Sequence, residues 1–265
     1  MTAPPPPPSL ALLDDAVEAS TPPDARTAAP AIDPTPKPAI AAKPKARKRR
    51  RPKGPAGRRL VNHDRGLGVR FVAGADEAGR GCLAGPLVAA AVLFDVKSLG
   101  PKEVRALSAL NDSKQHTQAA REALYPVVLR LAAKVHVVSR CAPGIDERGL
   151  HVTNLQALRD ALTAVARPGC VLLSDGFRLG DLGHPHRAIV DGDATSAAIA
   201  AASIIAKVSR DRFMHRADVR HPGWEFAGHV GYSSPAHRAA IRRQGISPLH
   251  RRSFQSAAYT QLELD

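Results

Sequence analysis

The sequence predicts a three-layer α/β domain around a mixed central sheet, with a small helical extension at its C-terminal end. Short apolar runs of strand length alternate along the chain with longer segments of helical spacing. The glycine-rich connection at residues 79–86 is short enough to make the first two strands antiparallel, whereas the later strands are expected to run parallel to the first. With 265 residues, 44% of them hydrophobic, the chain is long enough to bury one sizeable core.

The individual elements follow from this spacing in chain order. Apolar runs bounded by glycine, proline or polar residues predict strands at residues 70–75, 87–94, 135–139, 171–174 and 188–190. Apolar positions that repeat every three to four residues predict helices at residues 101–131, with a turn at 111–114, and at residues 154–166 and 195–218. The domain is expected to span residues 60–265, with its helical extension beginning at about residue 215.

Residues 1–59 have a different composition and are expected to be a disordered tail. They are rich in proline and alanine and contain few residues that bury apolar surface. Residues 43–59 are densely cationic and contain no acid, and the whole chain has a formal net charge of +14. This charge favours a nucleic acid over an anionic membrane surface as the partner. The tail is then a non-specific DNA tether in a bacterium, a nuclear-localisation-type signal, or a solubilising extension, and we take the tether as our expectation.

The cysteines and the apolar runs predict where the protein resides. Cys82, Cys141 and Cys170 are widely spaced and lack any pairing that suits zinc or a disulfide framework, which points to a reducing compartment. The chain shows no secretory leader pattern and no apolar run near the roughly 20 residues that cross a bilayer. We therefore expect a soluble monomer in the bacterial cytoplasm or nucleoid, without membrane contact.

Acidic residues follow three of the predicted strands. Asp76 and Glu77 end the first, Asp175 ends the strand at 171–174, and Asp193 follows the last. Ligand sites in α/β sheets gather at the carboxyl ends of strands, and adjacent carboxylates stay ionised only if a cation offsets them. Mg²⁺ or Mn²⁺ would meet this need, and two such ions can clamp the attacking and leaving oxygens of a phosphodiester. A turn at Asp175 and a helix N-cap at Asp193 are the structural alternatives, and a cap does not exclude a metal ligand.

From about Val72 to Phe254 the chain resembles the type 2 ribonucleases H, the ribonuclease HII family. The segment GADEAGRGCLAGPLVAAAV at residues 74–92 is similar to the family's first hairpin almost residue for residue. Further ordered matches are NDSK at 111–114, IDE at 145–147, DG at 175–176, GDA at 192–194, AASIIAKV at 201–208, GY at 231–232 and SPLHRRSF at 247–254. The resemblance implies a ribonuclease H-like fold for residues 60–265. It also implies that the catalytic, metal-binding carboxylates are Asp76, Glu77, Asp175 and Asp193.

The same resemblance implies a substrate-binding surface beside these acids. Gly79, Arg80 and Gly81 are expected to read the 2′-hydroxyl of a ribonucleotide through backbone groups, with the arginine near a phosphate. Glycines let the backbone approach a sugar closely, and the 2′-hydroxyl separates RNA from DNA. Tyr232 matches the family tyrosine that stacks on the sugar next to the ribonucleotide, although a lone tyrosine is more often half-buried in a core. Phosphate contacts are expected from Ser113, Lys114 and Lys207, with a structural ion pair to Asp211 as the alternative for Lys207.

Some residues of the C-terminal motif and two departures complete this picture. Arg251 and Arg252 are further candidates for phosphate contacts, and we expect His250 to pack and hydrogen-bond rather than to catalyse. Asp191 stands where the family commonly has lysine, and Gly149 stands where asparagine is usual. Neither departure removes a carboxylate.

The resemblance implies a metal-dependent endoribonuclease. It would hydrolyse the RNA strand of RNA-DNA hybrids and nick duplex DNA on the 5′ side of an embedded ribonucleotide, as in ribonucleotide excision repair. The products would carry a 3′-hydroxyl and a 5′-phosphate. A DNA nuclease or transposase of related fold would use similar acids but has no need of the Gly-Arg-Gly and tyrosine pair. A non-catalytic DNA-binding protein has no need of the acids.

Overall fold

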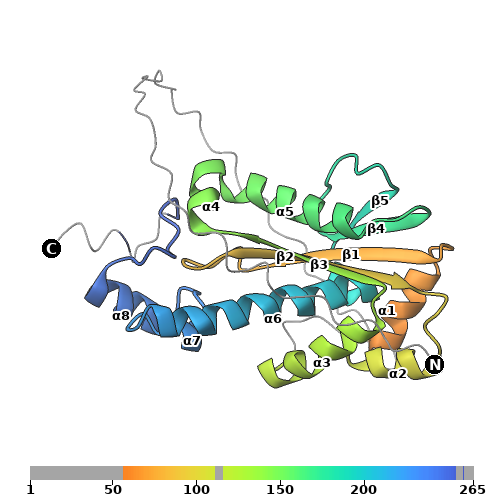
Figure 1. The fold of residues 1–265 in the computed structure, drawn as a ribbon, viewed down its shortest axis with the longest axis horizontal. Coiled ribbons are helices and arrows are strands. Elements are labelled where there is room, and N and C mark those ends of the chain that lie inside the picture. The colour runs from red at the N-terminus through yellow and green to blue at the C-terminus, as the bar shows by residue number, and fades with distance from the viewer. Residues whose placement is uncertain (1–55, 111–115, 255–258, 260–265) are drawn as a thin grey trace, which may run out of the picture. The chain divides into compact units, whose positions relative to one another are not determined.

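A five-stranded mixed sheet with strand order β3-β2-β1-β4-β5 forms the centre of the domain (Figure 1). The computed structural model describes residues 56–110, 116–254 and 259. The first three strands are antiparallel neighbours, and β4 and β5 run parallel to β1. The strands are β1 (Phe71–Ala78), β2 (Leu87–Asp95), β3 (Lys134–Arg140), β4 (Cys170–Asp175) and β5 (His186–Ile189).

Helices cover both faces of this sheet, so the predicted α/β fold with three layers is confirmed (Figure 1). The helices are α1 (Ala56–Arg65), α2 (Pro101–Ala106), α3 (Gln118–Leu131), α4 (Ala142–Arg148), α5 (Leu150–Val165), α6 (Ala197–Arg220), α7 (Phe226–His229) and α8 (Pro235–Gln244). Two short 3₁₀ turns are η2 (Leu107–Ala109) and η4 (Gly192–Ala194). Among the described helices none is long and apolar enough to span a membrane.

Successive residues of the central strands supply two separate cores, one on each face. Val72 packs with α6 on one side, and its neighbour Ala73 packs with Leu158 and Leu162 of α5 on the other. This is the period of two that a sheet buried on both faces requires. The long helix α6 lies directly on β1, because a Cβ built on Gly74 would meet the backbone nitrogen of Ile199 at 2.2 Å. The small side chains predicted for this contact are therefore needed for it.

The sequence located the strands well but ended the first one too early. β1 continues three residues beyond residue 75, because Asp76 and Glu77 still pair with Ala90 and Ala89 of β2. Its parallel pairing with β4 stops at Ala75. The two acids therefore lie within β1, beyond its last pair with β4, and they belong to the hairpin with β2.

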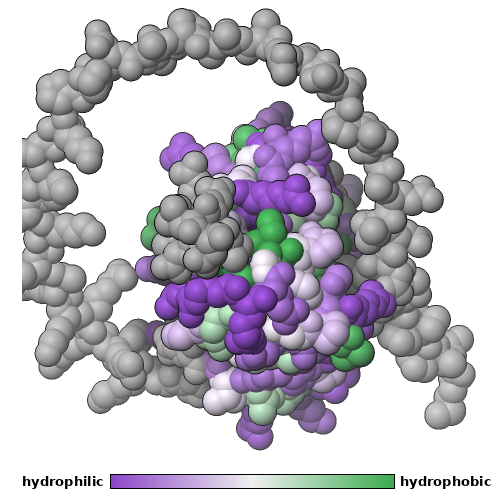
Figure 2. All heavy atoms as spheres, turned by 90° about the vertical axis from the view of Figure 1, so that its left-hand side faces the viewer, coloured by the Kyte–Doolittle hydropathy of each residue, from purple (hydrophilic) through white to green (hydrophobic). Residues whose placement is uncertain are grey.

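The ends of the predicted domain also fall inside helices. The expected boundary at residue 59 lies within α1, whose Leu60 and Val61 are 2% and 1% exposed. The expected start of the helical extension at residue 215 lies within α6, and the extension itself consists of α7 and α8. The extension occupies one end of the domain (Figure 1). The surface at this end is mostly hydrophilic (Figure 2). The turn predicted at residues 111–114 lies outside the described residues.

Candidate active site

A hollow opens where the carboxyl ends of β1 and β4 meet the start of the connection to β2. It brings together three of the four predicted acids, the whole Gly-Arg-Gly element and the predicted tyrosine. Its lining consists of Asp76, Glu77, Ala78, Gly79, Arg80, Gly81, Arg121, Asp175, Ser203, Lys207 and Tyr232. Acids, cations and an aromatic ring from five separate segments thus face one space.

Asp76 is the most deeply buried of the three acids that line the hollow, at 7% exposed. Burial raises the pKa of its carboxyl to about 8, and the neighbouring charge of Glu77 adds to the rise. Hydrogen bonds from the Ser203 side chain and from the Glu77 backbone nitrogen, 2.7 Å from Asp76 Oδ1, act in the opposite direction. The two hydrogen bonds fix the position of the Asp76 carboxyl. They do not offset the cost of its buried negative charge, and so its pKa stays high.

The Glu77 carboxyl also has a raised pKa, and one of its oxygens lacks a hydrogen-bond partner among the described residues. Burial raises its pKa to about 7; the charge of Arg80 works against this rise, and that of Asp175 adds to it. Its Oε2 atom is buried and has no hydrogen-bond partner among the described residues. The Asn154 amide lies near enough to favour the ionised carboxylate, although both of its polar atoms lack a partner with hydrogen-bond geometry. Buried polar atoms without partners, next to a carboxyl with a raised pKa, indicate a site where a ligand or ion is expected to bind.

Asp175 and Asp193 are linked through the η4 turn. Asp175 Oδ1 accepts a hydrogen bond of 2.8 Å from the Gly192 backbone nitrogen. Asp193, the next residue, is 7% exposed and is not among the residues that line the hollow. The N-cap considered for it is wrong, because Ser196 caps α6 by accepting from the Ile199 nitrogen, and Asp64 of α1 accepts from the Ala198 nitrogen. Asp193 thus lies next to the site, one residue from the backbone that fixes Asp175.

The acids fit a hard divalent cation. Carboxylate oxygens are the ligands that Mg²⁺ and Mn²⁺ take, and three carboxylates facing one hollow can be ionised together only if a cation is bound. Within the described residues, no three histidine, cysteine or acidic side chains are already gathered as a metal cluster.

The Gly-Arg-Gly element forms the rim of the hollow. Gly79 has φ +88°, and a Cβ there would meet Arg210 Nε at 1.9 Å, so only glycine fits. Gly81 has open space around its Cα, which leaves room for a ligand to approach the backbone. The exposed Arg80 is oriented by Phe177, whose ring centroid lies 4.8 Å from the Arg80 guanidinium carbon.

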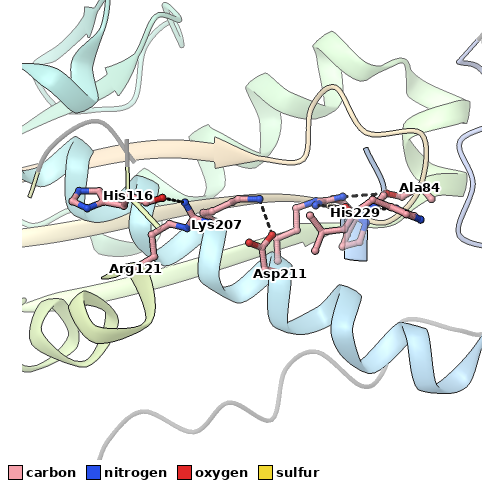
Figure 3. Close-up of polar contacts among 10 residues, drawn as sticks. Ala84, His116, Arg121, Lys207, Asp211 and His229 are labelled. Carbon is pink, nitrogen blue, oxygen red and sulfur yellow. Dashed lines mark hydrogen bonds and ion pairs between the residues drawn. The ribbon is translucent and has the colours of Figure 1, made fainter. Parts of the chain in front are cut away.

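Tyr232 and Lys207 also face the hollow. Tyr232 is 43% exposed and lines the hollow, so its ring is partly buried and partly open to a ligand. Lys207 Nζ lies 5.2 Å from the Tyr232 ring centroid and 2.8 Å from Asp211 Oδ1 (Figure 3). The structural ion pair is therefore present, and Lys207 also lines the hollow.

Two fully buried arginines hold the loop that carries the Gly-Arg-Gly element. Arg210 donates to the carbonyls of Pro86, Ala84 and Val230 at 2.8 to 3.0 Å (Figure 3). Arg251 donates to the carbonyls of Gly85 and Arg80 at 2.9 to 3.1 Å. The phosphate contact suggested for Arg251 is therefore wrong, because its guanidinium is buried and bound to backbone oxygens.

Sequence reasoning missed several lining or supporting side chains. Arg121 of α3 faces the hollow and donates to the His116 carbonyl at 2.6 Å (Figure 3). No motif marked Arg121, since it reaches the site only through the packing of α3. Ser203 stood within the match AASIIAKV at residues 201–208 without a role of its own, and Phe177 follows Asp175 by two positions. Ser113 and Lys114, both predicted to bind substrate, lie outside the described residues.

Comparisons with known proteins agree with this arrangement. The family model described as Ribonuclease HII matches residues 73–257. Ribonuclease HII of Mycobacterium avium is 51% identical over 188 residues, covering 71% of this chain and 79% of that protein, and its Nocardia farcinica counterpart is 52% identical over 190 residues, covering 71% and 73%. The crystal structure of ribonuclease H2 from Pyrococcus horikoshii superposes with a TM-score of 0.62 at 27% identity, covering 73% of this chain and 97% of that one. The chain therefore belongs to the ribonuclease HII family of metal-dependent nucleases.

Proposed function

We propose that this protein cuts the RNA strand of RNA-DNA hybrids and nicks duplex DNA on the 5′ side of an embedded ribonucleotide. The products carry a 3′-hydroxyl and a 5′-phosphate. One observation carries the proposal: the acids Asp76, Glu77 and Asp175 share a hollow with the Gly-Arg-Gly element and an exposed tyrosine. Acids alone suit any metal-dependent nuclease, whereas a sugar-reading loop beside them suits one that recognises ribose.

The four acids Asp76, Glu77, Asp175 and Asp193 would hold two Mn²⁺ or Mg²⁺ ions. Such ions would supply Lewis-acid chemistry, by lowering the pKa of a water and by offsetting charge on the departing 3′-oxygen. The protein's part is to keep the carboxylates fixed, and Gly192 N–H does this for Asp175. Ser203 and the Glu77 backbone do the same for Asp76.

The remaining lining residues bind and orient the nucleic acid. Gly79 and Gly81 offer backbone groups to the 2′-hydroxyl at a rim without obstructing side chains. Arg80, held over Phe177, contacts a phosphate next to the scissile one, and Lys207 and Arg121 add positive charge to the same wall. Tyr232 stacks on the neighbouring sugar and so favours a junction between RNA and DNA. Ser113 and Lys114 are proposed as further phosphate contacts.

The proposal also covers the role of residues 1–59, the oligomeric state and the cellular location. Residues 1–59 supply screened, sequence-independent attraction to DNA, because residues 43–59 are cationic throughout and contain no acid. The enzyme acts as a monomer in the bacterial cytoplasm or nucleoid, in ribonucleotide excision repair.

A three-substrate assay tests the proposal. Labelled duplexes with one ribonucleotide, with a continuous RNA strand, and with DNA only are incubated with Mg²⁺, with Mn²⁺, or with a chelator. We expect cleavage of the first two duplexes with metal and no cleavage with chelator. Asp76→Asn should be inactive, and the matched variant Asp95→Asn at the far end of the same hairpin should be active. Cleavage of the all-DNA duplex at a similar rate would instead identify a DNA nuclease.

A further inference from the structure

Three histidines, His229, His237 and His250, pack together beside the loop that carries Tyr232. The His229 and His237 ring centroids are 4.1 Å apart with an interplanar angle of 16°, and those of His237 and His250 are 5.1 Å apart. His237 is fully buried and His250 is 3% exposed. The ring of Phe226 lies 5.8 to 6.0 Å from each of them. Polar rings buried this deeply require defined hydrogen-bond partners.

Backbone partners fix the direction of the hydrogen bonds through His250 and His237. The Ser247 hydroxyl also lies 2.8 Å from His250 Nδ1 and can donate to it. The Ser247 backbone N–H can only donate, and it lies 2.8 Å from His250 Nδ1, so this nitrogen accepts. A neutral His250 then carries its proton on Nε2 and donates to His237 Nε2 at 3.1 Å. His237 in turn carries its proton on Nδ1 and donates to the Tyr232 carbonyl at 2.9 Å, which can only accept. The result is a one-way relay from Ser247 to the Tyr232 backbone.

Both rings of the relay must be neutral for it to form. A proton on His250 Nδ1 would face the Ser247 N–H, and a proton on His237 Nε2 would face that of His250. Burial lowers the pKa of each ring to about 4, and this keeps both neutral near pH 7. His229 fits the same pattern, since its Nδ1 accepts from the Gly231 nitrogen at 3.1 Å and its Nε2 lies 2.8 Å from the Trp224 carbonyl.

The segment that the relay holds is strained. Val230 has φ +43°, a conformation that a β-branched residue rarely adopts, and Gly231 follows with φ +84°. Such a backbone persists only when its surroundings determine it. The Val230 carbonyl accepts from Arg210, the Gly231 carbonyl accepts from the backbone nitrogen of Leu83, and the Tyr232 carbonyl accepts from His237. The Tyr232 carbonyl also accepts from the Ser234 backbone nitrogen at 2.8 Å, and His237 is the side-chain donor that holds it.

We propose that His237, oriented by His250, is a positioning residue that sets Tyr232 at the wall of the active-site hollow. The inference rests on the proposed substrate contact of Tyr232. It follows that the two histidines act on the choice of substrate through Tyr232, without touching the nucleic acid.

Two amide variants of the same residue separate positioning from packing. In His237→Asn the side-chain amide nitrogen takes the place of Nδ1 and still donates to the Tyr232 carbonyl. In His237→Gln the amide reaches the place of Nε2, so it meets His250 and leaves the Tyr232 carbonyl without this donor. The readout is kcat/KM on a duplex with one ribonucleotide, divided by kcat/KM on a continuous hybrid. We expect His237→Gln to lower this ratio about tenfold, the loss of one buried hydrogen bond, and His237→Asn to stay within about threefold of the native protein.

A double-mutant cycle and two further variants complete the test. In a Tyr232→Ala background, His237→Gln should lower the ratio by less than about twofold, because the residue it positions is gone. His250→Asn keeps an acceptor for Ser247 but ends short of His237, and should give a smaller loss in the same direction. His136→Asn on β3 is the matched control and should leave the ratio unchanged. Circular dichroism at the assay temperature establishes that each variant is folded.

Four outcomes would overturn the inference. Equal ratios for His237→Gln and His237→Asn would mean that the ring only fills space. A full additive loss in the Tyr232→Ala background would mean that His237 does not act through Tyr232. If Tyr232→Ala itself leaves the ratio unchanged, the proposed substrate contact fails and the inference fails with it; a loss in Tyr232→Ala together with a native-like His237→Gln would overturn the inference alone.

Discussion

Replacing Asp76 by asparagine should make the metal-free protein more stable while abolishing cleavage. The Asp76 carboxyl has a pKa of about 8, against an ordinary value of 3.8, because it is buried next to Glu77. A pH of 7 lies about 3 units above the ordinary pKa, and each of these units costs ~1.36 kcal/mol. The burial of this acid therefore disfavours folding at pH 7 by roughly 4 kcal/mol. Asparagine has the same shape, can accept the same backbone hydrogen bond and carries no charge, so we expect it to recover much of this free energy.

The sign of the pH dependence follows from the raised pKa. The carboxyl is protonated more readily in the folded protein than in the unfolded chain, so wild-type stability falls as the pH rises from about 4 to about 8. The stability of Asp76→Asn should vary less over this window, and the difference between the two proteins should widen with pH. Added Mg²⁺ or Mn²⁺ should stabilise the wild type more than the variant, because the cation offsets the charge that asparagine lacks.

Urea unfolding at pH 5, 7 and 8.5, with chelator or with metal, measures these differences. Asp95→Asn is the control, since Asp95 lies on the same hairpin but its pKa is lowered by its hydrogen bond to Arg70, 2.8 Å away. This variant should be slightly less stable than the wild type at pH 7 and should keep its activity. Our reasoning would be refuted if Asp76→Asn were less stable than the wild type at pH 8.5 in chelator, or if the difference did not grow with pH.

Four further predictions concern the parts that surround the site. Removing residues 1–53 should leave kcat unchanged but flatten the dependence of DNA affinity on salt, measured by fluorescence anisotropy; an unchanged slope would reject the tether. Asp64→Ala should lower the free energy of unfolding by about 1–2 kcal/mol in urea titrations, because it removes the acceptor for the Ala198 nitrogen at the start of α6, and an unchanged midpoint would contradict this cap. Stability should fall as the pH is lowered from 6.5 towards 4, since burial lowers the pKa of His237 and His250, and His237→Asn should reduce this dependence in acid titrations followed by fluorescence. Arg251→Met should lower the free energy of unfolding by about 3 kcal/mol or more and raise KM, because the Arg80 and Gly85 carbonyls lose their buried donor; an unchanged KM would show that the loop does not need it.

The meeting of Asp76 and Asp175 could be predicted from the sequence because it depends on local patterns. An apolar run that ends in an acid identifies a strand and its carboxyl end, and parallel strands bring such ends to one edge. The glycines of the Gly-Arg-Gly element were predictable for a similar reason, since their conformation is a property of a short segment. The extension of β1 past Ala75 was not, because it depends on pairing with β2 alone after β4 has ended.

What could not be predicted depends on partners far apart in sequence. Charged residues are rarely fully buried, so Arg210 and Arg251 suggested surface positions, and only the folded chain brings carbonyls near residue 85 to them. His237 and His250 likewise showed no spacing that indicated a relay. At the start of α6 Ser196 caps the helix, and Asp64 accepts from the Ala198 nitrogen 134 positions away; this second, long-range contact could not be predicted from the sequence.

The position and the chemistry of the nick in a duplex with one ribonucleotide test the central claim most directly. In the proposed function water attacks on the 5′ side of the ribonucleotide, so the upstream strand should end in a 3′-hydroxyl that a polymerase extends, and the ribonucleotide should carry the 5′-phosphate. This outcome should require Mg²⁺ or Mn²⁺ and should disappear in Asp76→Asn. A nick on the 3′ side that leaves a cyclic phosphate, or a nick that persists in chelator, would contradict the account.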